Sequence, residues 1–99
     1  MNHPQPPPEV AEVAAAMREN AVACGLGERA VWVYFYTEVP SRPEWHVCDN
    51  FECGMGSLIY YGGAWYRRSL YLAEDDPIAG GQAGAIEAAR HTFRTVIPR

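Results

Sequence analysis

Lysine is absent from this 99-residue chain, so all eight basic residues are arginines, and twelve acidic residues outnumber them. The formal net charge of −4 comes from residues 1–50, which carry three Arg and seven acids, because residues 51–99 carry five of each. Proteins that bind nucleic acid through its phosphates present a basic surface. The charge therefore argues against a general nucleic-acid binder, and the use of arginine alone favours bidentate or stacked contacts.

Long apolar runs are also missing, and cysteines are few. No stretch approaches the roughly 18 apolar residues of a membrane span. Residues 1–8 have neither the basic nor the apolar region of a secretory signal. Three cysteines, Cys24, Cys48 and Cys53, are too few and too odd in number for a disulfide framework. We expect a cytoplasmic protein with reduced thiols and no membrane contact.

The composition that remains is that of one globular domain, with 48% hydrophobic and 20% charged residues. A chain of this length can bury one two-layer core without disulfides or metal. Residues 1–8 are rich in proline and predict a flexible arm, and residues 9–99 predict a single domain without internal repeats.

An N-terminal helix is expected from about Pro8 to Cys24. Proline is favoured in the first turn of a helix, and Gly25 followed by Leu26 is typical of a left-handed C-terminal cap. Apolar residues recur at spacings of three and four and predict one buried stripe. Its members are Val10, Val13, Met17, Ala21 and Cys24.

A hairpin over residues 57–73 is the feature around which the chain is organised. The pair Gly62-Gly63 can adopt the positive φ angles of a tight primed turn. The predicted cross-strand pairs are Tyr60–Trp65, Leu58–Arg67 and Ile59–Tyr66. We assign the aliphatic face to the core, with Ile59, Leu70 and Leu72. The outer face then carries Tyr60, Trp65, Arg67 and Tyr71.

Two strands are expected before the hairpin. Residues 29–37 are apolar on both faces; Val31, Val33 and Phe35 are assigned to the core, and Trp32, Tyr34 and Tyr36 to the outer face. Residues 45–48 predict a short strand beside it. Nearby prolines favour an edge strand or a loop start over a central strand. Residues 49–56 predict a loop, and such loops often carry function.

The last element is a helix from Asp76 or Pro77 to about Val96. The acids at 74–76 are interpreted as a helix cap that complements the helix dipole, in preference to a divalent-ion site. Glycines at 80, 81 and 84 mean that the helix starts late or that another group approaches closely. Residues 80–84 are discounted as a phosphate cradle because three acids precede them.

The sequence therefore predicts an α+β domain in which a single antiparallel sheet of three to four strands carries an N-terminal and a C-terminal helix on one face. The opposite sheet face, here called the open face, is expected to be uncovered. This element order over residues 9–97 resembles that of double-stranded-RNA-binding domains. In that family a lysine cluster begins the second helix and grips phosphates, whereas residues 80–85 carry no basic residue here. The resemblance therefore implies the layered fold, and not the activity.

Aromatic side chains on the open face are the main candidate site, because such patches usually mark interfaces and Trp and Arg often dominate binding energy. The alternatives are that residues 39–56 fold over this face or that it pairs with itself in a homodimer. The candidate partner-binding residues are Trp32, Tyr34, Tyr36, Tyr60, Trp65, Arg67 and Tyr71.

A second candidate site consists of His46, Cys48 and Cys53. A thiolate pair and an imidazole can begin a zinc site, but a closed site needs a fourth ligand. His46 and Cys48 alternate by two and can share a strand face, as a Cys–His nucleophile pair requires. The fourth metal ligand would have to come from elsewhere, as Cys24, Asp49 or His91, and no group that orients a nucleophile pair is evident. We therefore predict neither a metal site nor catalysis.

We expect a non-enzymatic protein-binding module without a cofactor, acting as an adaptor or inhibitor. The aromatic face is the predicted contact, with the loop at 49–56 as a second one. Small acidic single domains are typical of phage-encoded inhibitors that bind host defence complexes. The alternatives are a single-stranded nucleic-acid binder, in which bases stack on the aromatic face, and a small metal- or thiol-dependent protein.

Overall fold

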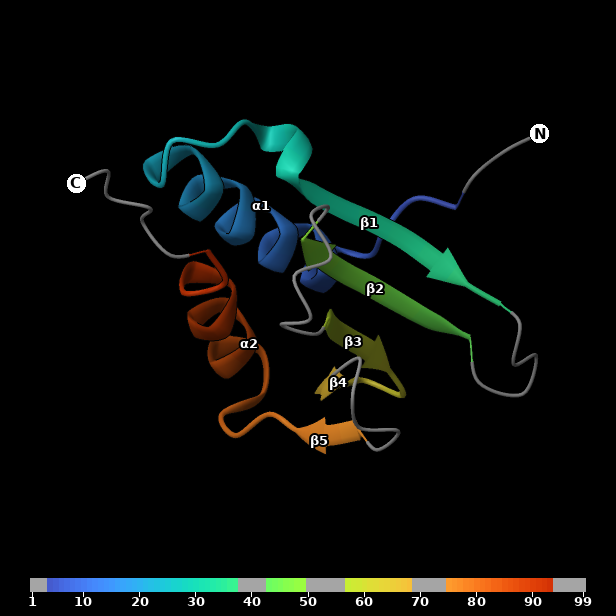
Figure 1. Ribbon diagram of the computed structural model, residues 1–99. Coiled ribbons are helices and arrows are strands. Elements are labelled where there is room, and N and C mark those ends of the chain that lie inside the picture. Colours follow the sequence, from blue (N-terminus) through green and yellow to red (C-terminus); the bar gives the residue numbers. More distant parts are fainter. Residues whose placement is uncertain (1–3, 38–42, 50–56, 69–74, 94–99) are drawn as a thin grey trace.

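The computed structural model describes residues 4–37, 43–49, 57–68 and 75–93, which form a layer of two helices on a five-stranded sheet (Figure 1). The elements in chain order are α1 (Pro8–Ala23), the 3-10 helix η1 (Glu28–Ala30), β1 (Val31–Tyr36), β2 (Glu44–Asp49), β3 (Ser57–Tyr61), β4 (Ala64–Arg68), β5 (Asp75–Pro77) and α2 (Gly81–Arg90). Among the described residues, neither α-helix has the length and hydropathy of a membrane span.

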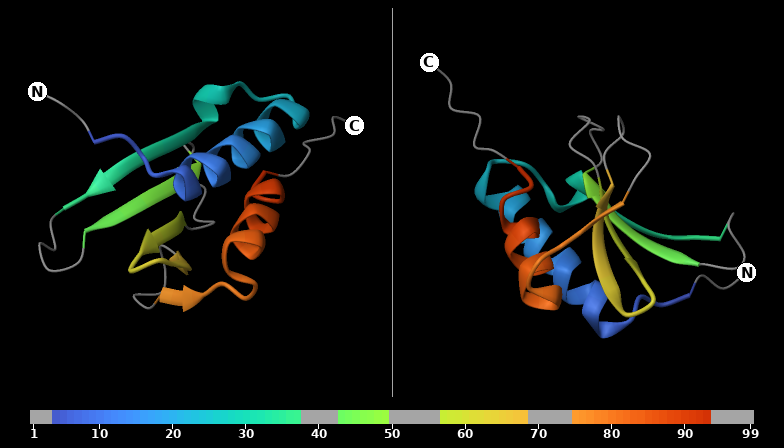
Figure 2. Two further views of the ribbon diagram at one scale, coloured as in Figure 1. Left: turned by 180° about the vertical axis from the view of Figure 1, so that it is seen from behind. Right: turned by 90° about the horizontal axis from the view of Figure 1, so that it is seen from below.

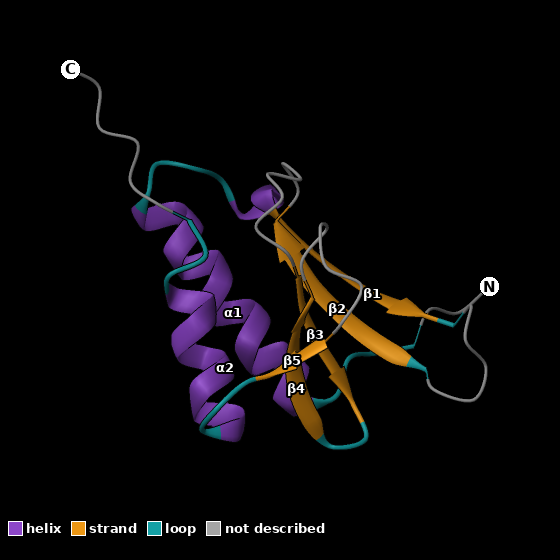
Figure 3. Cartoon of the chain, turned by 60° about the horizontal axis from the view of Figure 1, so that its bottom comes forward, coloured by secondary structure: helices purple, strands orange, loops and turns teal. Residues whose placement is uncertain are grey.

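The sheet is antiparallel throughout, with the strands in the order β1-β2-β3-β4-β5. Both helices lie on one face of it (Figures 2 and 3). The predicted α+β class and the placement of both helices are confirmed. The sheet has five strands instead of three or four, because Asp75–Pro77 pairs with β4 as an additional edge strand.

Helix α1 follows the sequence prediction closely. It begins at Pro8, and Val10, Val13, Met17 and Ala21 are at most 1% exposed. At its end Gly25 has a φ of +87°, and the Leu26 N–H bonds to the Ala21 carbonyl at 2.8 Å. This bond and the left-handed glycine form a Schellman cap, which satisfies carbonyls that the helix leaves unpaired.

The hairpin has the predicted register but the opposite facing. Gly62 and Gly63 have φ angles of +60° and +78°, and Tyr60 pairs with Trp65 as expected. Trp65 does not project from the open face; it is 3% exposed and belongs to the core beneath the helices. Its indole Nε1 donates a 2.7 Å hydrogen bond to Oε1 of Gln82 on α2.

Small side chains on the helices explain this facing. The buried helix surface is rich in alanine, at positions 14, 16, 21, 85 and 89. Because protein interiors are packed densely, a layer of methyl groups needs large side chains opposite it. The rings of Trp65 and Tyr60 supply that volume, and the Tyr60 hydroxyl also donates to Glu9 on α1 at 3.3 Å.

Strand β2 is a central strand, although its neighbouring prolines favoured an edge strand or a loop start. It lies between β1 and β3, and Val47 at its centre is fully buried. Pro43 stands immediately before the strand and so takes no place in the ladder. Strand β1 is shorter than predicted because residues 28–30 form η1. Of the predicted loop at 49–56, Asp49 ends β2 and the rest lies outside the described residues.

Helix α2 starts later than predicted, at Gly81, and the predicted cap is wrong. No side chain caps the helix, and Asp76 and Pro77 belong to β5. Its N-cap, Gly80, has a left-handed φ of +87°. The predicted end near Val96 lies outside the described residues, and the helix ends at Arg90.

Gly84 lies in the first turns of α2, where the backbone of Ala79 comes so close that a side chain does not fit. A Cβ at this position would lie 1.9 Å from the carbonyl oxygen of Ala79. Gly84→Ala is therefore expected to destabilise the fold by about 2 kcal/mol or more, although alanine is the better helix former. Urea denaturation measures this, with Gly27→Ala as control, because a Cβ there meets nothing closer than 4.0 Å. Equal stabilities of the two variants would contradict the packing.

The buried position of Trp65 makes a second prediction. Trp65→Ala is expected to cost about 3–5 kcal/mol or to prevent folding, because it leaves a cavity under α2. Trp32→Ala, at a tryptophan that is 53% exposed, is expected to change the free energy of unfolding by less than about 1 kcal/mol. Thermal and urea denaturation compare the two variants. A larger loss from Trp32→Ala would reverse the assignment of the faces.

Candidate functional site

The predicted contact residues divide between the two faces of the sheet. Side chains alternate along a strand, and directly paired residues share a face. Trp32, Tyr34 and Tyr36 lie on the open face as predicted, whereas Tyr60, Trp65 and Arg67 lie on the side of the helices. Arg67 is exposed there, opposite Asp76. Tyr71, Leu70, Leu72 and Cys53 lie outside the described residues.

Three aromatic side chains on β1, here called the aromatic patch, follow one another along the edge of the sheet. They are Trp32, Tyr34 and Tyr36. Trp32 is 53% exposed and Tyr34 41%, while Tyr36 is half-buried. The imidazole of His46 packs against both tyrosines, with ring centroids 4.8 Å from Tyr34 and 5.2 Å from Tyr36. The patch therefore exposes ring surface, while its two tyrosines pack on a buried imidazole.

The middle of the open face is buried, which limits the predicted exposure to β1. Ile59 on β3 is fully buried, although it lies on the face opposite the helices. Glu44 is also fully buried, and His46 is 6% exposed. The expectation that the open face is uncovered is therefore wrong for its centre.

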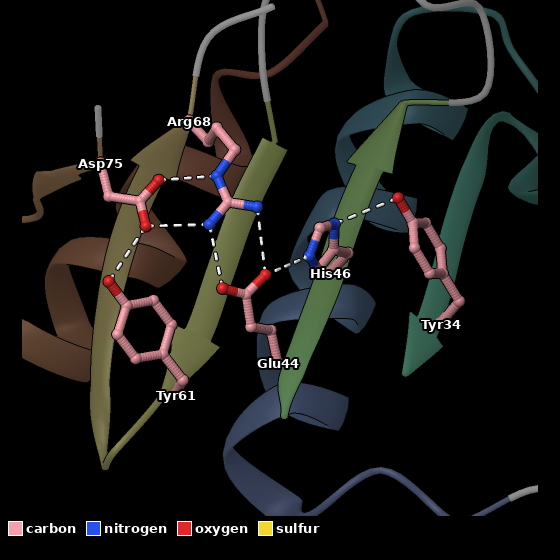
Figure 4. Close-up of polar contacts among 6 residues, drawn as sticks. All are labelled: Tyr34, Glu44, His46, Tyr61, Arg68 and Asp75. Atoms are coloured by element: carbon pink, nitrogen blue, oxygen red, sulfur yellow. Dashed lines mark hydrogen bonds and ion pairs between the residues drawn. The ribbon is translucent and has the colours of Figure 1, made fainter. Parts of the chain in front are cut away.

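Arg68 joins two carboxylates across this face (Figure 4). Its Nη1 and Nη2 donate to Oε1 and Oε2 of Glu44 at 3.1 and 3.0 Å. Its Nε and Nη2 donate to Oδ1 and Oδ2 of Asp75 at 2.6 and 2.9 Å. The Tyr61 hydroxyl donates to Asp75 at 3.0 Å. The guanidinium thus uses all three nitrogens in two bidentate pairs, the strongest form of this contact.

His46 connects this ion pair to the aromatic patch. Its Nε2 lies 2.9 Å from Glu44 Oε1, and its Nδ1 lies 3.1 Å from the Tyr34 hydroxyl. Since a carboxylate only accepts, Nε2 carries the proton and donates to Glu44. In the neutral ring, Nδ1 then accepts from the Tyr34 O–H. We call the connected residues the polar network; they are Tyr34, Glu44, His46, Tyr61, Arg68 and Asp75.

Burial and pairing set the charges of the network. Burial raises the pKa of Glu44, but hydrogen bonds from Arg68 and His46 outweigh it and hold the pKa below its ordinary value. Burial lowers the pKa of His46, against the opposing effect of Glu44. The pKa of Arg68 is raised by its hydrogen bonds to Asp75 and then Glu44. Burial also raises the pKa of Tyr34, so its hydroxyl stays protonated.

The arrangement gives no support to a metal centre. His46 and Cys48 do share the open face, but both ring nitrogens of His46 are engaged by Tyr34 and Glu44. Coordination through either nitrogen would break one of these bonds. In the part of the chain that the structure describes, no group of three His, Cys, Asp or Glu side chains could hold a metal ion.

The sequence did not reveal the link among Arg68, Glu44 and Asp75, because these residues stand on three separate strands and meet only in the folded sheet. A shift of one residue in the facing of β4 exchanges Arg67 and Arg68. The pairing of residues in the hairpin could have placed Arg68, because it sets which side chains share a face. Once Trp65 is assigned to the core, alternation places Arg68 on the open face. Asp75, interpreted as part of a helix cap, instead pairs with Arg68.

Comparisons with family models, with curated proteins and with solved structures gave no match to this chain.

Acid is expected to destabilise the fold in two steps. The pKa of His46 is below its ordinary 6.5, so just below that pH the unfolded chain binds more protons than the folded one. The free energy of unfolding therefore falls as the pH drops through this window, by at most about 1.4 kcal/mol per pH unit. The lowered pKa of Glu44 adds a further loss below its ordinary 4.5. Urea denaturation at a series of pH values measures both steps.

His46→Gln tests the first of these steps, because glutamine keeps a donor for Glu44 and does not titrate. The variant is expected to lose the pH dependence near neutrality. His91→Gln, at an exposed histidine next to Glu87, removes one histidine outside the network and is expected to keep it. An unchanged slope in His46→Gln would contradict the assignment.

Proposed function

We propose that this chain is a non-enzymatic protein-binding module, an adaptor or inhibitor that docks its partner through the aromatic patch. The carrying observation is the exposure of Trp32 and Tyr34, at 53% and 41%, side by side on one edge strand. Aromatic side chains are enriched at protein interfaces and dominate their binding energy. Trp65, Tyr60 and Arg67 are not part of the proposed contact, since they lie on the helix side.

Rigidity of the patch supports this function. The Tyr34 hydroxyl is held by His46, and His46 is held by Glu44. Tyr34 and Tyr36 both pack on the same imidazole. A contact surface fixed before binding loses less side-chain entropy when the partner arrives. His46 thus holds the two tyrosines of the patch in place.

Single-stranded nucleic acid is a weaker candidate. Its binding needs cations along the backbone as well as aromatic stacking. On the described part of the open face, Arg68 is the one basic residue, and both of its bidentate pairs are with carboxylates. A metal- or thiol-dependent activity is weaker still, because His46 is committed to the network. The proposed cytoplasmic site of action rests on the cysteine count.

Position-specific photo-crosslinking tests the proposal. A photoreactive phenylalanine analogue replaces Trp32 in one variant and Val22 in the other. Val22 is the matched control, because it is apolar, 54% exposed, and lies on α1 in the opposite layer. We expect position 32, but not position 22, to cross-link one discrete protein from bacterial lysate, with or without nuclease.

The captured protein is then purified and titrated with the Trp32→Ala variant. Binding is expected to weaken by about ten-fold or more, as for an aromatic residue that dominates an interface. The same cross-links from both positions, or capture of nucleic acid alone, would overturn the proposal.

A further inference from the structure

Strand β1 forms one edge of the sheet (Figure 1). Among the described residues it pairs on one side only, with β2, so its other side carries backbone N–H and C=O groups that point away from the sheet. Such a row of groups can add a further strand through the same hydrogen bonds that join the strands of a sheet. An extended main chain is therefore the occupant that this edge fits.

The residue pairs of the sheet show which backbone groups of β1 point outward. Each residue of an antiparallel strand directs its N–H and C=O to one side, and the side alternates along the strand. Tyr61 and Ala64 close the two-residue turn and are therefore a hydrogen-bonded pair. Tyr60 then faces Trp45 on β2, which leaves Phe35, opposite Trp45 on β1, to direct its groups outward. By alternation, the outward residues are Val31, Val33 and Phe35.

Two of these three residues offer both of their backbone groups. The N–H of Val31 donates to the carbonyl of Glu28, which agrees with an outward direction but uses this donor. In the described part of the chain, no backbone bond of the turns and loops involves Val33 or Phe35. Their N–H and C=O groups are therefore the ones that an added strand can pair with.

The sequence of β1 is complementary to itself. All six residues of Val31–Tyr36 are β-branched or aromatic, the types that are enriched in strands. None is charged and none is proline, so two copies of the strand bring no like charges together and lose no donor. On the helix side, Val33 packs against the core, and Phe35 packs on Trp45 with ring centroids 4.8 Å apart. A second copy thus continues the apolar surface.

We propose that β1 pairs with β1 of a second copy of this chain, antiparallel and about a two-fold axis at Tyr34. This register places Val33 of one copy opposite Phe35 of the other, and the two such pairs form about four hydrogen bonds. On the open face, Tyr34 lies opposite Tyr34, and Trp32 lies opposite Tyr36. Aromatic pairs across neighbouring strands stabilise a sheet.

Val31 decides between this register and the neighbouring one. A two-fold axis at Val33 pairs Val31 with Phe35 and needs the N–H of Val31, which is already bonded to Glu28. An axis at Tyr34 uses the complete groups of Val33 and Phe35. The register with its axis at Tyr34 therefore forms its central bonds without breaking one inside the chain.

The inference goes beyond the proposed function and is compatible with it. Edge pairing covers the backbone of β1, whereas the side chains of the open face stand roughly perpendicular to the sheet. The aromatic patches of the two copies then lie side by side about the axis. Together they present one larger surface to a partner protein.

Sedimentation velocity of the purified chain tests the pairing. We expect a species of twice the chain mass of 11.0 kDa that dissociates on dilution, because a contact through one strand is at the small end of protein interfaces. Trp32→Lys places a charge at the contact and is expected to weaken association by about ten-fold or more.

Val22→Lys is the matched control for this variant. Val22 is 54% exposed, compared with 53% for Trp32, and it lies on α1 in the opposite layer. We expect it to leave association unchanged. A chain that stays monomeric up to about 1 mM, or an equal loss from both variants, would overturn the inference.

Amide hydrogen exchange locates the contact in the native chain. The N–H groups of Val33 and Phe35 are expected to exchange about ten-fold more slowly in the dimer than after dilution to the monomer. The N–H groups of Tyr34 and Tyr36, which point to β2, are the internal controls and are expected to change less. A dimer in which Val33 and Phe35 exchange as fast as in the monomer would overturn the inference.

A mixture of carbon-13-labelled and unlabelled chains measures the register by NMR. A contact between the Hα atoms of Tyr34 in the two copies is expected, because opposing residues that share no hydrogen bonds have the closest Cα atoms. A contact from Trp32 of one copy to Tyr34 of the other would move the axis to Val33 and overturn the stated register.

Failure here is distinguishable from failure of the proposed function. The pairing is measured on the purified chain alone, whereas docking of a different protein is measured by cross-linking from position 32 in lysate. A monomer that cross-links one discrete protein would overturn the pairing and leave the binding module standing. A dimer that cross-links from position 32 only to a second copy would support the pairing and overturn the docking of a different protein.

Discussion

A fully buried carboxylate is the constraint on which the sheet depends. Glu44 is fully buried, and its two oxygens receive both terminal nitrogens of Arg68 and the ring N–H of His46. Leaving such a charge without partners would cost several kcal/mol, so the three side chains form a unit. Because β3 lies between β2 and β4, this unit spans three strands on the face that the helices do not support. Asp75 extends it to β5.

The two faces of the sheet are stabilised by different physics. On the helix side, alanine-rich helices meet large rings, and Gln82 links α1, α2 and β4 by accepting from Trp65 and donating to Glu9 and Glu12. On the open face, charge pairing replaces helix packing. The aromatic patch lies on the edge strand β1, at the end of this network of charged and polar side chains. Within the patch, the Tyr34 hydroxyl is linked to Arg68 through His46 and Glu44.

Local patterns predicted the elements and the hairpin register. Which sheet face packs against the helices depends on contacts between elements that are distant in sequence. The Gly25 cap, the stripe of α1 and the Tyr60–Trp65 pair each rest on neighbours in sequence. The facing of the hairpin depends on the volume that the helices leave free, which the assignment of aliphatic residues to the core did not consider. The network escaped prediction for a related reason. Glu44, Arg68 and Asp75 come from separate strands, and a carboxylate beside proline gives no sign of burial.

The two edges of the sheet differ in a way that bears on aggregation. Strand β5 is three residues long and contains two aspartates and a proline, features that discourage pairing with another chain. Strand β1 is six residues long, uncharged and free of proline. Outward backbone groups alternate in step with side chains, so antiparallel pairing of two β1 strands aligns like faces into one continuous sheet. Such pairing uses the β1 edge of both copies, so the edges that remain on the joined sheet are the two β5 strands. Edge-to-edge growth therefore stops at a closed pair and does not proceed to a fibre.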